Sequence, residues 1–114
     1  MPLIFMLAML VGNPPVLSVP DAKDVWIAHL HICENDVNKE KILDSNDKYS
    51  YGYLMFQMDT WLSYGKPFGA TMKNISDPVL QTRVARSMLD DGEFYHWKTC
   101  VRKTTKKWGA YPSS

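Results

Sequence analysis

The chain has 114 residues, of which 46% are hydrophobic and 22% are charged, and its formal net charge at pH 7 is +1. This length allows one small domain with a single hydrophobic core. The near-neutral charge excludes proteins that bind bulk nucleic acid through a strongly basic surface, so we expect no nucleic-acid partner.

The first 20 residues differ in composition from the rest of the chain. Residues 3–11 form a continuous apolar run that is too short to span a bilayer, and the helix-breaking letters GNPP follow it. This order is typical of a signal-peptide core, although no Lys or Arg precedes the run, and Val16 and Ser18 supply small residues for a cleavage site. We therefore expect residues 1–20 to be a leader that provides any membrane contact. A buried strand or an uncleaved anchor is the alternative.

The domain itself is expected to span residues 21–114 and to begin with a helix. Asp21 is a favourable N-cap, and apolar residues recur at helical spacing until the pattern stops near residue 34. The expected buried face of this helix comprises Ala22, Val25, Trp26, Leu30 and Cys33. The polar, irregular residues 35–49 that follow are interpreted as a surface loop.

The middle of the chain is the aromatic stretch SYGYLMFQMDTW at residues 50–61. We interpret it as irregular or strand-like, with Asp59 and Thr60 capping a short helix that ends at Gly65. Residues 66–74 contain a proline and a glycine and are expected to be a connection.

Two more helices are predicted in the C-terminal part of the chain. Ser76-Asp77-Pro78 combines a capping side chain with a proline in the first turn, and Gly92 is a favourable stop. The expected buried residues of the two helices are Val79, Leu80, Val84, Met88 and Leu89 in the first, and Phe94, Trp97, Cys100, Val101 and Trp108 in the second. The lysines of the last helix point outward, which is typical of a solvated face, with contact to an anionic polymer as the alternative. The fold class is therefore mainly α.

The two cysteines, Cys33 and Cys100, are too far apart in the sequence to form a metal-binding pair. In an oxidising compartment they could form one disulfide, which would stabilise the domain by about 4 kcal/mol in the chain-entropy model. Two unpaired buried thiols are the alternative. His29 and His31 point in different directions from a helix, so we expect no metal ion, and we expect no cofactor.

Glu34 is the first candidate for chemistry because it lies at the C-terminal end of the first helix. The negative end of the helix dipole and partial burial oppose ionisation there, and both raise the pKa of a carboxyl toward that of a general acid. Taken by position alone, a solvated glutamate at a helix end is the ordinary interpretation.

Several short motifs occur in a fixed order along residues 22–112. They are Cys33-Glu34-Asn35 at the end of the first helix, Ser50-Tyr51-Gly52 in the aromatic stretch, Gln81 with Ala85-Arg86-Ser87-Met88, and His96-Trp97-Lys98-Thr99-Cys100. In this order and spacing the chain resembles the lysozyme-like lytic transglycosylases, and most of all their small bacterial members. The resemblance implies a small lysozyme-like helical domain in which a short irregular or β segment forms the substrate cleft.

The resemblance also implies a substrate and a mechanism. Glu34 would protonate the glycosidic oxygen between N-acetylmuramic acid and N-acetylglucosamine in peptidoglycan glycan strands, and would then act as the base that helps the muramoyl 6-hydroxyl attack its own anomeric carbon. Two-carboxylate glycosidases need a second acid. Asp36, Asp47 and Asp59 are available, but no motif marks them, so one acid with two roles fits the sequence better. We expect a monomeric enzyme that is secreted or located in the cell envelope.

The expected substrate-binding residues are Ser50, Tyr51, Gly52, Tyr53, Gln57 and Tyr111. A bare backbone at Gly52 would let the chain approach a sugar ring, and the neighbouring tyrosines would supply flat faces and hydroxyls. The alternative for Gly52 is a bulge packed in the core. The alternative for Tyr111 is a tether for the C-terminus.

Two positions depart from the family pattern. Asn35 stands where the family has Ser, and Met55 stands where it has a Gln that contributes to the substrate groove. The open alternatives are a muramidase that hydrolyses the same bond, a non-catalytic glycan-binding module in which Met55 marks lost turnover, and a secreted helical domain with a purely structural role.

Overall fold

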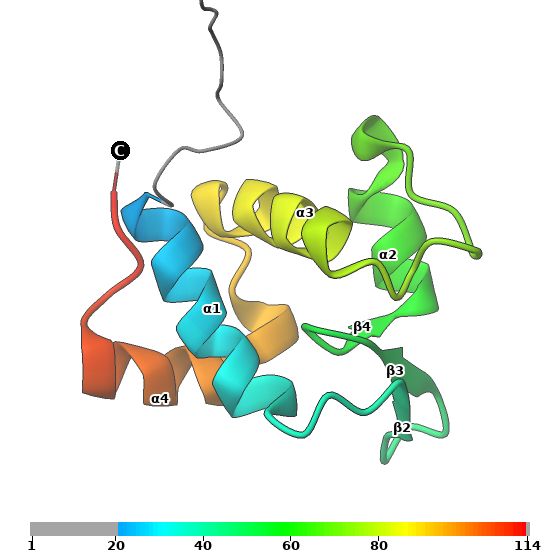
Figure 1. Cartoon of the computed structure of the whole chain (residues 1–114), viewed down its shortest axis with the longest axis horizontal. Helices are drawn as coiled ribbons and strands as arrows, with labels where there is room; N and C mark the ends of the chain where they lie inside the picture. Colours follow the sequence, from blue (N-terminus) through cyan, green and yellow to red (C-terminus); the bar gives the residue numbers. More distant parts are fainter. Residues whose placement is uncertain (1–20, 114) are drawn as a thin grey trace, which may run out of the picture.

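The computed structural model describes residues 21–113, which form four α-helices, two 3-10 helices and a small antiparallel sheet (Figure 1). The elements in chain order are α1 (Ala22–Asn35), β2 (Lys41–Leu43), β3 (Tyr49–Tyr51), β4 (Phe56–Gln57), α2 (Met58–Tyr64), η2 (Lys66–Phe68), α3 (Pro78–Asp90), η3 (Tyr95–Trp97) and α4 (Lys98–Trp108). The expectation of a mainly α-helical domain is confirmed. The predicted leader, residues 1–20, lies outside the described residues.

Helix α1 begins where its cap predicts, because the Asp21 carboxylate accepts a hydrogen bond from the backbone N–H of Asp24 at 3.0 Å. Its buried residues are Trp26, Ile27, Leu30, His31 and Asn35. The predicted face was therefore wrong at Ala22, Val25 and Cys33, which are exposed. The buried stripe is displaced toward Ile27 and His31 because α1 packs against α3 as well as α4.

The sheet has the order β2-β3-β4, with Ile42 opposite Ser50 and Ser50 opposite Gln57. The interpretation of residues 35–49 as loop throughout was wrong at β2, which pairs with β3 through a tight turn in which the Asp44 N–H donates to the Lys48 carbonyl at 2.8 Å. All three residues of β2 are exposed, so this strand lacks the buried alternation that would have marked it in the sequence.

Helix α3 begins at its predicted cap, and α2 and α3 end close to their predicted stops. The predicted capping of α2 by Asp59 and Thr60 was wrong, because both lie inside the helix, which begins at Met58 after Gln57 and has no side-chain cap. Asp77 caps α3 by accepting hydrogen bonds from the N–H groups of Val79 and Leu80, and α2 ends at Gly65. Val79 itself is 67% exposed, so its predicted burial was wrong. Phe94 and Trp108 were also predicted to be buried and are exposed instead. The ring of Trp108 stacks on His29 with 3.8 Å between the ring centroids.

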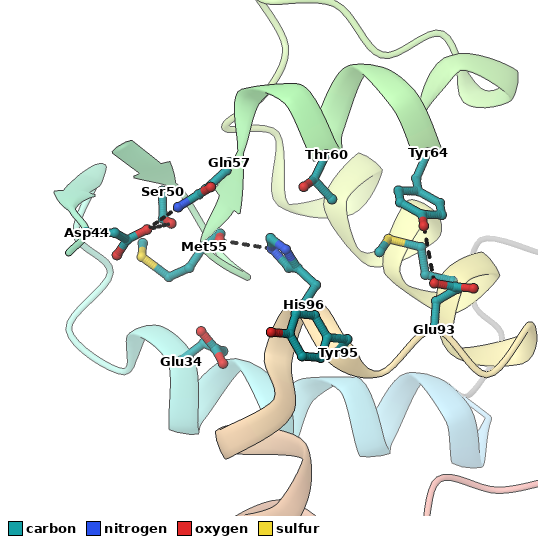
Figure 2. A pocket seen from close by; sticks show the side chains of 11 residues that line it. Glu34, Asp44, Ser50, Met55, Gln57, Thr60, Tyr64, Glu93, Tyr95 and His96 are labelled. Atoms are coloured by element: carbon teal, nitrogen blue, oxygen red, sulfur yellow. Dashed lines mark hydrogen bonds between the residues drawn. The ribbon is translucent and has the colours of Figure 1, made fainter. Parts of the chain in front are cut away.

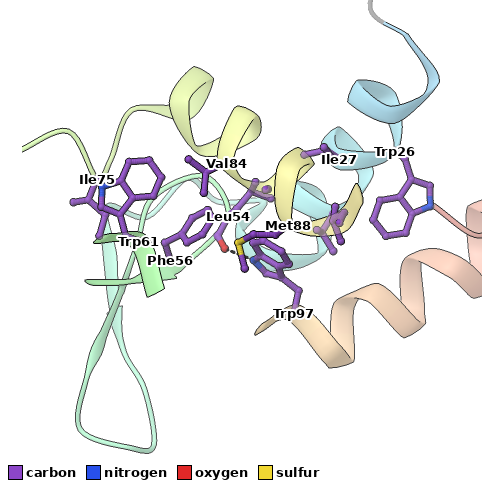
Figure 3. Close-up of a cluster of buried hydrophobic side chains, with 12 residues drawn as sticks. Trp26, Ile27, Leu54, Phe56, Trp61, Ile75, Val84, Met88 and Trp97 are labelled. Carbon is purple, nitrogen blue, oxygen red and sulfur yellow. Dashed lines mark hydrogen bonds between the residues drawn. The ribbon is translucent and has the colours of Figure 1, made fainter. Parts of the chain in front are cut away.

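The core joins the sheet to the helices through aromatic contacts (Figure 3). Phe56 of β4 meets Trp61 of α2 and Trp97 of η3 edge to face, at centroid distances of 5.1 and 5.3 Å. Trp26, Trp61 and Trp97 are buried, as expected. This cluster fixes the position of the sheet relative to α1 and η3.

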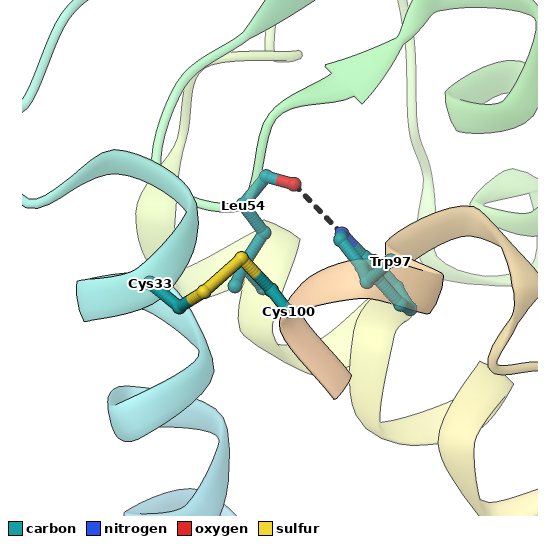
Figure 4. Close-up of a disulfide and its surroundings, with 4 residues drawn as sticks. All are labelled: Cys33, Leu54, Trp97 and Cys100. Atoms are coloured by element: carbon teal, nitrogen blue, oxygen red, sulfur yellow. Dashed lines mark hydrogen bonds between the residues drawn. A yellow bond between two sulfur atoms is a disulfide. The ribbon is translucent and has the colours of Figure 1, made fainter. Parts of the chain in front are cut away.

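Cys33 and Cys100 form a disulfide, with 5.7 Å between their Cα atoms (Figure 4). The bond joins the last turns of α1 to the first turn of α4, directly beside Glu34 in the sequence. Within residues 21–113, no helix has the length and apolar content required to cross a bilayer.

Candidate active site

A cavity of about 480 Å³ separates the end of α1 from the sheet (Figure 2). Its lining residues are Glu34, Asp44, Ser50, Met55, Gln57, Thr60, Tyr64, Met88, Glu93, Tyr95 and His96. The Glu34 side chain points into the cavity from α1. Across from it lie Ser50 and Gln57 on the sheet and Asp44 in the turn after β2. The structure therefore brings together three of the predicted site residues: Glu34, Ser50 and Gln57.

The Glu34 carboxyl is the most strongly perturbed acid in the cavity. Burial is the largest cause, and the negative charge of Asp44 adds to it; together they raise the pKa of Glu34 from 4.5 to about 7. A carboxyl with this pKa is present in both its acid and its base form near neutral pH. It can therefore donate a proton and later accept one.

Asp44 is a site residue that the sequence analysis missed. Its carboxylate accepts hydrogen bonds from the hydroxyl of Ser50 and from Nε2 of Gln57, the latter at 2.8 Å. These two hydrogen bonds hold the Asp44 carboxylate in a fixed position at the edge of the cavity. Asp44, Ser50 and Gln57 lie on the same side of the sheet. Ser50 is directly opposite both Ile42 and Gln57, and Asp44, two residues after Ile42, points to the same side as Ile42.

The three acids considered earlier do not belong to this arrangement. Asp36, Asp47 and Asp59 are absent from the lining of the cavity, and Asp59 forms an exposed ion pair with Lys48 at 2.9 Å. The signal for Asp44 was the turn-forming stretch Asp44-Ser45-Asn46-Asp47 between KIL and YSY, which is typical of a hairpin. A hairpin at this point would have placed Asp44 beside Ser50.

The segment from Tyr51 to Met55 crosses the middle of the protein as a turn, and side chains hold its carbonyl groups. Each of the five carbonyl oxygens accepts a hydrogen bond from one side chain. The donors, in chain order from Tyr51 to Met55, are Gln81 Nε2 (2.8 Å), Asn35 Nδ2 (2.9 Å), His31 Nδ1 (2.7 Å), Trp97 Nε1 (2.8 Å) and His96 Nε2 (3.3 Å). Buried carbonyls in a turn need such partners. Four of these five donors, Asn35, Gln81, His96 and Trp97, belong to the motifs found in the sequence. They position the segment that brings Met55 into the lining of the cavity.

Asn35 is one of these partners, and it stands where the transglycosylases that the sequence resembles have Ser. Besides holding the Gly52 carbonyl, its side chain donates to the carbonyl of Lys39 at 2.8 Å and accepts from the N–H of Lys39 at 2.9 Å. The amide therefore ties the end of α1, and Glu34 with it, to the turn at Gly52.

Gly52 is required for a different reason from the one expected. Its φ angle is +73°, and a Cβ atom there would lie 2.8 Å from Nε2 of Gln81 and 3.3 Å from Cα of Ser76. The side of Gly52 that lacks a Cβ faces α3 rather than the cavity, so the expectation that it lets the backbone approach a sugar was wrong. Glycine is needed here because the turn is left-handed and packs closely against α3.

The predicted tyrosines also lie outside the cavity lining. Tyr53 stacks on His31 with 3.7 Å between the ring centroids. The Tyr111 hydroxyl donates to Asp90 at 2.7 Å and its ring contacts Trp26, so burial raises the pKa of Tyr111 and the side chain fixes the C-terminus. The tether interpretation of Tyr111 is the one that fits.

Met55 and His96 complete the cavity beside Glu34. Met55 is 7% exposed and adopts a φ of +54°, a left-handed conformation that is uncommon for a residue other than glycine, asparagine or aspartate. Burial lowers the pKa of His96, although its hydrogen bond to Met55 and the charges of Asp44 and Asp59 act in the opposite direction. His96 is therefore a neutral donor near physiological pH.

No protein-family model matches this chain, and no curated protein or solved structure is significantly similar to it. The grounds for a function are therefore the chemistry of the cavity and the motifs found in the sequence.

Proposed function

We propose that this protein is a lytic transglycosylase that cleaves the β-1,4 bond between N-acetylmuramic acid and N-acetylglucosamine in peptidoglycan. The observation that carries the proposal is Glu34, a carboxyl with a pKa of about 7 that points into a cavity also lined by Asp44 and Glu93. A pKa matched to the working pH is what general acid catalysis requires. The cavity also contains groups that can hydrogen-bond a sugar, the hydroxyls of Ser50 and Thr60 and the amide of Gln57.

The reaction follows from one carboxyl in two roles. Protonated Glu34 gives its proton to the glycosidic oxygen as the bond from that oxygen to the muramoyl C1 breaks, and the sugar develops positive charge. The Asp44 carboxylate, held by Ser50 and Gln57, stabilises this charge. Ionised Glu34 then takes the proton of the 6-hydroxyl as its oxygen bonds to C1. The product is a 1,6-anhydro ring, and no water is consumed.

A muramidase is the second candidate, and Asp44 is the observation that favours it. Glycosidases that use water place two carboxyl groups on either side of the scissile bond, one as acid and one as nucleophile or base. Glu34 and Asp44 belong to different elements and line one cavity, as that scheme requires. In this case Glu34, once ionised, activates a water molecule instead of the 6-hydroxyl.

The disulfide fits the proposed location in the secreted fraction or the cell envelope, because disulfides persist in oxidising compartments. The substrate is found in the same place.

Digestion of purified peptidoglycan, followed by mass spectrometry, tests both candidates. A transglycosylase releases anhydromuramoyl products, lighter by one water than those of a muramidase, and takes up no label when the reaction runs in water enriched in oxygen-18. Labelled reducing ends identify the muramidase instead. If the protein binds the glycan and releases no products of either kind, it is a binding module and the proposal is overturned.

A further inference from the structure

A second cavity, of about 380 Å³, lies next to the candidate active site. Its lining residues are Gly92, Glu93, Phe94, Tyr95, Lys98, Val101 and Arg102. Glu93 and Tyr95 line both cavities, so these two side chains form the border between them. Figure 2 shows both on the side of the active-site cavity formed by the segment that leads into α4. A ligand held beside Glu34 can therefore extend past Tyr95 into the second cavity.

The second cavity carries positive charge at its far end. Lys98 and Arg102 are one helical turn apart on α4, and both are exposed. None of the ion pairs among residues 21–113 includes either of them. Nζ of Lys98 lies 5.3 Å from the ring centroid of Tyr95, which is itself 80% exposed. The two cations are thus available to an anionic ligand that reaches past this tyrosine.

The rest of the lining determines the shape of such a ligand. Phe94 and Val101 supply apolar surface, which suits small methyl groups. The carboxylate of Glu93 accepts a hydrogen bond from the Tyr64 hydroxyl at 3.2 Å, on the side of the first cavity. Its negative charge repels an anion at the border, so a carboxylate is favoured beside Lys98 and Arg102 and disfavoured beside Glu93.

We propose that the second cavity binds the acidic peptide stem that projects from the glycan strand held in the first cavity. This inference rests on the proposed function, because it takes the strand to be peptidoglycan. Its stems are short, contain alanine methyl groups and carry free carboxylates, which match the apolar surface and the two cations. An unsubstituted glycan such as chitin has no group to place there, so the cavity makes the enzyme favour strands that still carry their peptides.

Charge-neutral variants of α4 test this preference. Lys98→Gln/Arg102→Gln removes the two cations of the cavity, and Lys103→Gln/Lys107→Gln is the matched control, because it removes two cations with the same spacing from another part of the helix surface. On peptide-bearing strands, we expect the first double variant to raise KM about tenfold, the effect of losing two partly exposed charge contacts. On strands stripped of peptides by an amidase, its KM should equal that of the wild type. The control should match the wild type on both substrates.

Direct binding separates this inference from the proposed function. The N-acetylated tetrapeptide L-Ala-γ-D-Glu-L-Lys-D-Ala, which is anionic because its N-terminus is an uncharged amide as it is in the strand, is titrated into the full chain carrying Glu34→Gln and followed by NMR. Changes in the NMR chemical shifts of Tyr95 and Val101 that are lost in Lys98→Gln/Arg102→Gln support the peptide site. They support it even if the wild type cleaves no glycan and the proposed function fails. Absence of these shifts, or an equal loss of activity on stripped strands or in the control, overturns the inference.

Discussion

Asp44 and Glu34 come from different elements, the turn after β2 and the last turn of α1, and line the same cavity (Figure 2). The charge of Asp44 adds to burial in raising the pKa of Glu34 to about 7. Their proximity depends on contacts outside the cavity. Asn35 fastens the end of α1 to the Gly52 turn, and the disulfide fastens it to α4.

The first prediction concerns the pH dependence of cleavage. Glu34 must be protonated to donate its proton, so kcat/KM should be constant below the pKa of about 7 and fall tenfold per pH unit above it. Asp44→Asn removes the neighbouring negative charge while retaining an oxygen acceptor for Ser50 and Gln57. The fall should then begin at lower pH, and the plateau should drop because a neutral side chain stabilises positive charge less well. A pH–rate profile that keeps its midpoint in this variant would show that Asp44 does not act on Glu34.

Gly52→Ala should destabilise the fold more than Gly69→Ala does. Both glycines have positive φ angles, of +73° and +80°, so both variants lose about 1 kcal/mol from backbone strain. A Cβ at residue 52 also meets Gln81 and Ser76, whereas nothing lies within 4 Å of one at residue 69. We expect a total loss of about 2–4 kcal/mol for Gly52→Ala, measured by denaturant unfolding. Equal losses in the two variants would contradict the packing role of Gly52.

These elements show what could and could not be predicted from the sequence. The caps at Asp21 and Asp77 and the buried tryptophans other than Trp108 were predictable, because each depends on local chemistry or on helical periodicity. The strand β2 was missed because it has no buried face, and Asp44 was missed with it. The direction in which Gly52 faces depends on Gln81, which lies on a helix that packs against this turn only in the folded chain.

The disulfide should make a large contribution to stability. The two cysteines are 67 residues apart, and closing a loop of this length stabilises the fold by about 4 kcal/mol in the chain-entropy model. Cys33→Ser/Cys100→Ser should therefore lower the free energy of unfolding by about this amount, and it should also lower activity because Glu34 follows Cys33 directly. If denaturant unfolding gives the same free energy for the variant and the oxidised wild type, the bond has no stabilising role.

Met55→Gln should increase activity on peptidoglycan. Met55 lines the cavity beside Glu34 and offers a bound sugar no strong hydrogen-bonding group. A glutamine of similar length can donate to a sugar hydroxyl and accept from an N-acetyl N–H, so we expect KM to fall about three- to tenfold. Met88→Gln is the control, because Met88 also lines the cavity but, unlike Met55, belongs to the cluster of buried hydrophobic residues. This variant should lose stability without a gain in activity. A rise in KM for Met55→Gln would show that residue 55 does not contact the substrate.

The most direct test is to compare wild type, Glu34→Gln and Glu40→Gln on purified peptidoglycan while measuring the stability of each. Burial raises the pKa of Glu34 above its unfolded value of 4.5, so the folded state binds more protons and stability falls as the pH rises from about 4.5 to about 7. At pH 8, Glu34→Gln should therefore be more stable than the wild type, by about 1–3 kcal/mol, and yet release no soluble muropeptides. The exposed Glu40→Gln should match the wild type in both respects. Release of muropeptides by Glu34→Gln at the wild-type rate would contradict the assignment of Glu34 as the general acid.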